Sequence, residues 1–203
     1  MAEPLFTVGH SNHTIEHFLG LLRRHGVTVA CDVRSDPFSR YSPQFSRDPL
    51  RESLRVAGIS YLFLGKELGA RSENRACYRS GKVQFELLAR EPVFLEGLAR
   101  LLEGVRRQSV ALVCAEKDPL DCHRAILVAR KVHEAGVSVA HILADGELES
   151  HAELEKRLLK HLHIPSGDLF RTPRECLDEA YEIQGGRIAY QDAGMAETEE
   201  KYR

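Results

Sequence analysis

The sequence has no long apolar run, no marked excess of one charge and no Cys-x-x-Cys pair. A membrane-spanning helix needs roughly 18 or more consecutive apolar residues, and no stretch of the chain approaches that length. The first residues carry neither a basic nor an apolar segment, so we expect no signal peptide. The net charge of −2 gives no global electrostatic reason to bind nucleic acid or an anionic membrane. With 43% hydrophobic and 29% charged residues, we expect a soluble globular protein of the cytoplasm.

The five cysteines are odd in number and scattered, which argues against the disulfide framework of a secreted protein. The missing Cys-x-x-Cys spacing also disfavours a zinc ribbon and a thioredoxin-type redox motif. A metal site built from Cys114, Cys122, His10 and His123 is an alternative. Two cysteines eight residues apart at a strand end are a weak metal-binding pattern, however. We therefore expect no metal and no cofactor.

Apolar patches alternate with helical patterns along the chain. The helical stripes carry apolar residues at i, i+3, i+4 and i+7, and the patches between them are rich in β-branched residues. Alternation of strand and helix favours a parallel sheet with right-handed crossovers. The sequence therefore predicts an α/β fold: a mostly parallel five-stranded sheet with helices on both faces, plus a C-terminal helical appendage. The predicted strands are residues 4–8, 27–33, 59–64, 110–114 and 137–143.

The chain divides into two predicted parts. Residues 1–146 form an α/β domain that carries a polar site, and residues 147–203 form a helical appendage. The appendage contains a charged helix over residues 147–163 and a second helix over residues 173–184. Because no linker precedes them, we expect these helices to pack on the main domain. The polar tail after about residue 192 is expected to be frayed.

The segment 114–124 carries the densest group of reactive side chains. It joins a predicted strand to a predicted helix, and in a parallel sheet this junction lies at the carboxyl edge, where ligands bind. Thiols near Arg, His and a helix N-terminus can lose their proton near neutral pH. Cys122 is therefore a candidate nucleophile or tuned thiol, although it and Cys114 could equally be small buried apolar residues. A phosphatase loop, Cys-x5-Arg, does not fit, because Arg124 lies ten positions after one cysteine and two after the other.

Polar residues also follow the first two predicted strands. Ser11 and Asn12 could cap the next helix or hold an anion at its N-terminus, and His10 could be a base or a ligand contact. Asp32 and Arg34 share a face by strand alternation. This second pair could either form an ion pair or contact a ligand.

Two loops add further charge. The loop 37–45, which contains Arg40, has aromatic residues and prolines but no periodicity, as in an ordered loop over a pocket. The loop that begins at Lys66 and Glu67 carries five basic residues up to Lys82. Basic residues beside tyrosines can hold phosphates and stacked bases, but such runs are more often solvated loops.

Taken in order, several of these motifs resemble the family catalogued as domain of unknown function 488. They are Gly9-His-Ser, Asp32-Val-Arg, the loop 37–45, Leu64-Gly-Lys-Glu-Leu-Gly, Cys114-Ala-Glu, Cys122-His-Arg, His141-Ile, the helix near 154–159 and Arg187-Ile-Ala-Tyr. The resemblance covers roughly residues 5–190. It implies an α/β fold of mostly bacterial and archaeal proteins with a shared site, but no assigned reaction. The short segment 70–82 lacks the tryptophan-containing stretch of many relatives, which argues against a shared substrate cap.

Three functional hypotheses follow. The first is an enzyme that acts on a phosphate-bearing small molecule or nucleotide, with an acidic residue or histidine transferring protons and Cys122 as nucleophile. The second is a nucleic-acid-binding module without catalysis, and the third is a thiol redox sensor; the oligomeric state is open. The predicted catalytic residues are Cys122, His123, Asp32, Glu116, His10 and Cys114. The predicted ligand-binding residues are Ser11, Asn12, Arg34, Arg124, Arg40, Lys66 and Glu67.

Overall fold

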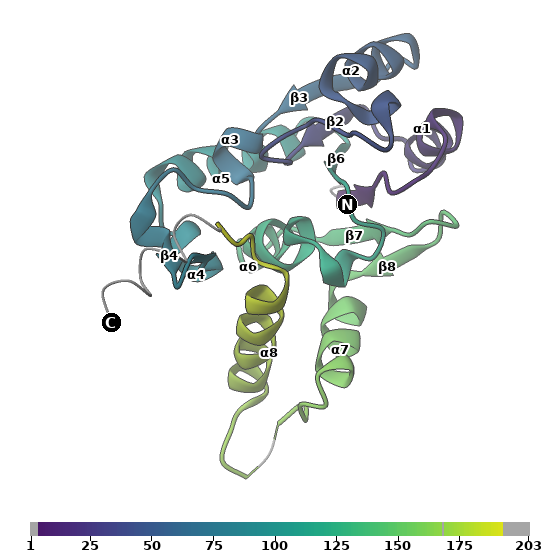
Figure 1. The fold of residues 1–203 in the computed structure, drawn as a ribbon. Helices are drawn as coiled ribbons and strands as arrows, with labels where there is room; N and C mark the ends of the chain where they lie inside the picture. The colour runs from purple at the N-terminus through teal and green to yellow at the C-terminus, as the bar shows by residue number, and fades with distance from the viewer. Residues whose placement is uncertain (1–3, 168, 193–203) are drawn as a thin grey trace.

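The computed structural model describes residues 4–167 and 169–192 (Figure 1). Six strands form one sheet in the order β3-β2-β6-β1-β7-β8. Five of them run parallel, and β8 pairs antiparallel with β7. The predicted α/β fold with a mostly parallel sheet is confirmed, with one more strand than expected. The strands are β1 Leu5–Gly9, β2 Val29–Asp32, β3 Ser60–Phe63, β6 Val110–Cys114, β7 Val139–Ile142 and β8 Leu148–Ser150.

Helices cover both faces of the sheet (Figure 1). Side chains alternate along a strand, so Ala111 and Val113 of β6 pack toward α1 and α2, whereas Leu112 and Cys114 pack toward α5 and α6. The helices bury their apolar stripes against these residues, each large side chain contributing about 1.5–3 kcal/mol. These four helices are α1 Ile15–Arg24, α2 Arg47–Val56, α5 Pro92–Val105 and α6 Arg130–Glu134.

The connections that follow the neighbouring strands β1 and β6 lead to opposite faces of the sheet. After β1 the chain enters α1 on one face, and after β6 it enters a π-helical segment, Arg124–Ala129, that continues into α6 on the other. Two bonds extend the ladder past the strand ends: the His10 amide donates to the Cys114 carbonyl and the Ser11 amide to the Ala115 carbonyl, both over 2.8 Å. A reversal of this kind opens a crevice at the carboxyl ends of the strands.

The segment from 65 to 91, expected as a polar loop and the approach to a helix, contains several short elements. They are too short to show a helical or strand period in the sequence. They comprise α3 Gly65–Leu68, the 3-10 helix Arg75–Cys77, the antiparallel pair β4 Tyr78–Arg79 and β5 Lys82–Val83, and α4 Phe85–Leu88. Two further 3-10 helices, Pro43–Phe45 and Pro119–Asp121, lie in the loops after β2 and β6.

The last two helices, α7 (His151–His161) and α8 (Pro173–Ile188), pack against each other and against the π-helical segment. The helix expected from residue 147 begins at His151, because Ser150 and Glu153 form a capping box and β8 occupies the preceding residues. Beyond α8 the chain returns to β5, where the Val83 amide donates to the Tyr190 carbonyl over 3.0 Å. The tail expected to be frayed lies outside the described residues.

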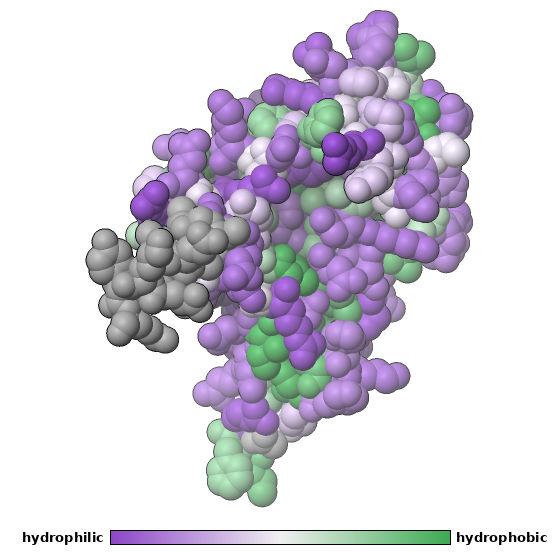
Figure 2. All heavy atoms as spheres, in the orientation of Figure 1, coloured by the Kyte–Doolittle hydropathy of each residue, from purple (hydrophilic) through white to green (hydrophobic). Residues whose placement is uncertain are grey.

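The visible surface is mostly hydrophilic, with pale and green side chains scattered over its upper half (Figure 2). Green side chains gather lower down, over α8 and at the tip of the loop between α7 and α8, where Leu169 and Phe170 are almost fully exposed. Across residues 4–167 and 169–192, no helix combines the length and apolar character needed to cross a bilayer.

A buried chain of hydrogen bonds ties β1, β7, α7 and α8 together. Thr7 donates to His141 Nδ1 (2.8 Å), His141 Nε2 to His151 Nδ1 (3.0 Å), and His151 Nε2 to the Tyr181 hydroxyl (3.0 Å). The Tyr181 hydroxyl in turn donates to Glu155 over 3.1 Å. Both histidines must be neutral for this order of donors, since each has one nitrogen that accepts.

We expect this chain to make the fold acid-sensitive. Burial, with the charges of His133 and Arg130, lowers the pKa of His151 from 6.5 to about 3, and burial lowers that of His141 well below 6.5. Below pH 6.5 the unfolded chain takes up protons that the folded chain excludes, so stability is full above that pH and falls as the pH drops toward 3. Between pH 7 and pH 5 each histidine should cost about 2 kcal/mol of unfolding free energy.

Urea unfolding at both pH values measures this loss, and the variant His151→Gln should reduce it by about 2 kcal/mol. The matched variant His161→Gln removes a histidine near the C-terminal end of α7 that is not buried and should leave the loss unchanged. An identical pH dependence in wild type and His151→Gln would contradict the expected role of the chain.

Candidate functional site

A polar hollow of about 340 Å³ lies at the crevice between the strand ends. His10 reaches it from the end of β1 and Arg34 from just beyond β2. Cys114, Glu116 and His123 reach it from the end of β6 and the turn that follows. The structure thus brings together five of the residues selected from the sequence, contributed by three separate strands.

Four of the side chains form a group that we term the thiol cluster: Cys114, Glu116, Cys122 and His123. The two sulfur atoms lie 3.0 and 2.8 Å from the same carboxylate oxygen, Oε2 of Glu116. The sulfur atoms of Cys114 and Cys122 also lie 3.7 and 4.0 Å from Nδ1 of His123. Both cysteines and the histidine are buried, so this convergence takes place out of bulk water.

The His123 ring is held in one orientation. Its Nε2 lies 3.0 Å from the Val33 carbonyl and donates to it, which leaves Nδ1 facing the two sulfur atoms. The hydrogen bond with Cys122 and burial raise the pKa of Cys114. Burial also raises the pKa of Cys122. The hydrogen bond from Cys114 and the charge of Arg124 lower it by more, so the net shift of the Cys122 pKa is downward. The two sulfur atoms therefore titrate as a pair, with the charge favoured on Cys122.

Arg34, which lines the hollow, forms a buried ion pair with Asp32 behind it. The guanidinium donates to both carboxylate oxygens of Asp32, over 2.9 and 2.6 Å, and Tyr61 donates to the same carboxylate over 2.9 Å. The third guanidinium nitrogen of Arg34, Nη1, lies 2.9 Å from the Phe45 carbonyl oxygen and 3.1 Å from Nε2 of His10. Burial is the main reason that the pKa of His10 falls to about 4. The His10 ring is neutral, and most of the bonding capacity of Arg34 is already used within the protein.

Arg124 is fully buried and hydrogen-bonds to the backbone of the loop after β6. Its guanidinium donates to the carbonyls of Glu116 and Lys117, over 2.7 and 3.2 Å. The loop lies directly against Gly9, where an added Cβ would come within 1.9 Å of the Glu116 carbonyl oxygen. Arg124, a predicted ligand-binding residue, holds the loop that carries Glu116.

Other predicted residues lie outside the lining of the hollow. Asp32, Cys122 and Arg124 are buried behind it. Helix α1 is capped by Thr14, whose hydroxyl accepts from the His17 amide, so neither Ser11 nor Asn12 serves as the cap. The remaining three do not line the hollow either. Glu67 pairs with Arg100 over 2.6 Å, and the side chains of Arg40 and Lys66 are exposed.

The hollow also contains residues that were not selected from the sequence. The guanidinium of Arg71 lies 4.4 Å from the centre of the Tyr190 ring, and both residues line the hollow with Phe38. Tyr190 comes from the segment after α8 and is more than one hundred residues away from Arg71 along the chain. The motif Arg187-Ile-Ala-Tyr was a signal for it, but nothing local in the sequence places that motif beside the strand ends.

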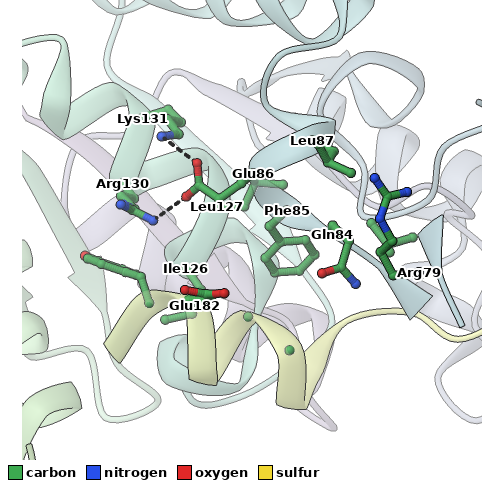
Figure 3. Close-up of a pocket in the computed structure, with 14 residues that line it drawn as sticks. Arg79, Gln84, Phe85, Glu86, Leu87, Ile126, Leu127, Arg130, Lys131 and Glu182 are labelled. Carbon is green, nitrogen blue, oxygen red and sulfur yellow. Dashed lines mark hydrogen bonds and ion pairs between the residues drawn. The ribbon is translucent and has the colours of Figure 1, made fainter. Parts of the chain in front are cut away.

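A second hollow, of about 270 Å³, lies between α4, α6 and α8. Figure 3 shows Arg130 and Lys131 of this hollow both turned toward Glu86; the ion-pair distances are 2.8 and 3.9 Å. Arg130 also stacks on Tyr181, 4.3 Å from the ring centre. Because these charges neutralise each other, the second hollow is a weaker candidate for a reactive site.

Fold and site together define an α/β protein with a thiol-bearing polar site at the carboxyl edge of its sheet. The chain belongs to the family described as domain of unknown function DUF488, whose model matches residues 14–130, more than half of the sequence. No curated protein and no solved structure matches the chain. The match confirms the family, and the matched stretch contains Asp32, Arg34 and the whole thiol cluster. The motifs Gly9-His-Ser, His141-Ile and Arg187-Ile-Ala-Tyr lie outside it.

Proposed function

We propose that this protein is an enzyme that acts on a small phosphate-bearing or nucleotide-like molecule bound in the hollow between β1, β2 and β6. The observation that carries the proposal is the meeting of polar side chains from three strand ends beside a cluster of two thiols, a carboxyl group and an imidazole. Ligands of α/β proteins bind at such crevices, and reactive groups gathered in a polar hollow mark a candidate active site.

The rim of the hollow suits a nucleotide. Stacking on Tyr190 occupies one face of the Arg71 guanidinium and leaves its N–H edges to bind phosphate oxygens in the plane. Phe38 lines the same hollow with 70% of its surface exposed, and a base can stack on an exposed aromatic ring. These two features support a ligand with both a phosphate and a flat ring.

The catalytic roles follow from which groups face the hollow. Cys114 and Glu116 line it, whereas Cys122 does not. We therefore assign proton transfer to Glu116 and contact with the ligand to Cys114, rather than the nucleophilic role first considered for Cys122. Both carboxylate oxygens of Asp32 accept hydrogen bonds from Arg34 or Tyr61, so its role in the proposal is to position Arg34.

We expect adenosine monophosphate and ribose 5-phosphate to bind, the nucleotide more tightly because of stacking. Replacing Arg71 with alanine should weaken both at least tenfold, about 1.4 kcal/mol, because a charge-assisted bond to phosphate is lost. Isothermal titration measures the affinities. The matched variant Arg51→Ala removes an exposed arginine of α2 that pairs with Asp48 over 3.5 Å, and it should bind like wild type.

Turnover is tested by phosphorus NMR of the incubated nucleotide. A new phosphorus resonance should form with wild type and not with Glu116→Gln, while Glu116→Gln still binds the nucleotide. If neither probe binds to wild type, or if Arg51→Ala weakens binding as much as Arg71→Ala, the proposed ligand is wrong.

The nucleic-acid alternative has less support. The last residue of the basic loop that motivated it is engaged within the protein, since Lys82 donates to the Gly186 carbonyl over 3.0 Å. Two arginines of α2 are engaged as well: Arg47 stacks on Phe63 at 4.5 Å and Arg55 pairs with Glu52 over 2.7 Å. The redox alternative keeps one supporting observation, since both sulfur atoms contact the same oxygen. Mass spectrometry after mild peroxide would show a Cys114–Cys122 disulfide if that hypothesis is correct.

A further inference from the structure

We propose that the thiol cluster binds one zinc ion through Cys114 Sγ, Cys122 Sγ and His123 Nδ1, with Glu116 Oε2 as a fourth ligand. The three sulfur and nitrogen atoms lie within 4.8 Å of one another. The carboxylate oxygen lies 3.0 and 2.8 Å from the two sulfur atoms. Three donor atoms of the types that zinc prefers therefore lie together, and the carboxylate oxygen lies beside two of them.

The spacing of the donors fits a tetrahedral zinc ion. Bonds of about 2.3 Å to sulfur and about 2.0 Å to nitrogen place neighbouring donors roughly 3.5–4 Å apart. The sulfur-to-nitrogen distances at His123 are 3.7 and 4.0 Å. Oε2 of Glu116 lies closer to the sulfur atoms than this, at 3.0 and 2.8 Å, and a withdrawal of its carboxylate by roughly half an ångström gives a zinc–oxygen bond of ordinary length.

The surroundings hold the ligands in place. Metal-bound histidines usually donate their second nitrogen to a carbonyl or carboxylate, which fixes the ring, and Nε2 of His123 donates to the Val33 carbonyl. Cys114 is the last residue of β6, a central strand of the sheet. Arg124 fixes the loop of Glu116 through two backbone carbonyls. Three of the four ligands thus have independent support for their positions.

The charges also balance. One zinc ion with two thiolates and one carboxylate carries a charge of −1, and the buried guanidinium of Arg124 beside them offsets it. In the metal-free cluster two thiols instead compete for one carboxylate oxygen. Binding forms two Zn–S bonds, and any proton still held by a sulfur atom is released to solvent, so no oxidant or reductant is needed. Thiolate and imidazole ligands favour zinc over magnesium, calcium or manganese.

The sequence disfavoured a metal site because the cysteine spacing is weak, and it included His10 among the alternative ligands. His10 instead faces Ser11 and Arg34, and Glu116 takes the fourth place. Cys114, Glu116 and His123 line the hollow, so a ligand there could displace Glu116 from the ion. Zinc binding itself does not depend on the proposed function; only this catalytic use of the ion rests on it.

Cobalt(II) and zinc(II) titrations of the full chain, purified under reducing conditions and without nucleotide, test the proposal. We expect one ion per chain, sulfur-to-cobalt charge-transfer absorption in the near ultraviolet and tetrahedral bands in the visible. Zinc should bleach these bands and protect two thiols from a disulfide reagent. Cys114→Ser and Cys122→Ser should each lose the charge-transfer band or bind at least one hundredfold more weakly, while Cys31→Ser, which removes a buried thiol elsewhere, should bind like wild type.

The wild-type spectrum decides the question even if a cysteine variant fails to fold. Absence of sulfur-to-cobalt absorption, or cobalt binding without protection of two thiols, would overturn the proposal. Equal loss in Cys31→Ser would do the same, because it would place the metal elsewhere. Purification of a Cys114–Cys122 disulfide that takes up no metal after reduction would replace the proposal by the redox alternative. Since no nucleotide is present, these outcomes are independent of whether the proposed ligand binds.

Discussion

Substitution of Asp32 with asparagine should lower the free energy of unfolding by about 3–5 kcal/mol, the usual cost of removing one partner from a buried ion pair. The Asp32 carboxylate is fully buried and Arg34 is 6% exposed. Asparagine has one carbonyl oxygen in place of two charged ones, and its amide group would face the guanidinium. The charge of Arg34 would then be buried without a counterion. Urea unfolding at pH 7 measures the loss.

Glu52→Gln is a matched control for this variant. Arg55 also donates to both oxygens of Glu52, over 2.9 and 2.7 Å, but this pair lies on the surface of α2, where ion pairs contribute little. It should therefore unfold like wild type. The double variant Asp32→Asn, Arg34→Met should recover part of the lost stability, because no buried charge is left alone. If Asp32→Asn is as stable as Glu52→Gln, the buried pair does not stabilise the fold.

The parallel sheet could be predicted because each of its strands is a local apolar run between turn residues. Strand β8 could not be, since it has three residues at an edge and Leu148 is its one apolar member. Its pairing with β7 depends on contacts across a turn and not on a pattern of its own. The same holds for α3 and α4, which are single turns of helix.

The meeting of strand ends at one hollow follows from parallel topology, so His10, Arg34 and Cys114 could be placed near one another from the sequence. The direction of each charged side chain could not. Arg124 turns inward because two carbonyls of the loop after β6 need hydrogen-bond donors there. No sequence motif shows which carbonyls lack a donor. Arg71 and Tyr190 reach the hollow from separate segments, through packing that is specified only in three dimensions.

Gly9→Ala should disrupt the fold about as strongly as the loss of the buried ion pair. Its Cβ would lie 1.9 Å from the Glu116 carbonyl oxygen and 2.9 Å from the carbonyl carbon, which are backbone atoms that cannot rotate away. Gly9 itself is fixed beside Cys114 by the register of β1 and β6. The methyl group must therefore push the loop off Arg124, and we expect a loss of about 3 kcal/mol or more in unfolding free energy.

The displaced loop carries Glu116, so a folded remainder of Gly9→Ala should also bind cobalt with weaker or altered sulfur-to-cobalt absorption. Gly20→Ala is the matched control, because Gly20 lies in α1 with no other atom within 4 Å of its added Cβ. That substitution should stabilise the protein by about 0.5–1 kcal/mol, since alanine favours helix. The two alanine variants add the same methyl group and differ only in what it meets. Equal stability of the two would mean that the loop after β6 is free to shift, and that close approach at Gly9 does not shape the thiol cluster.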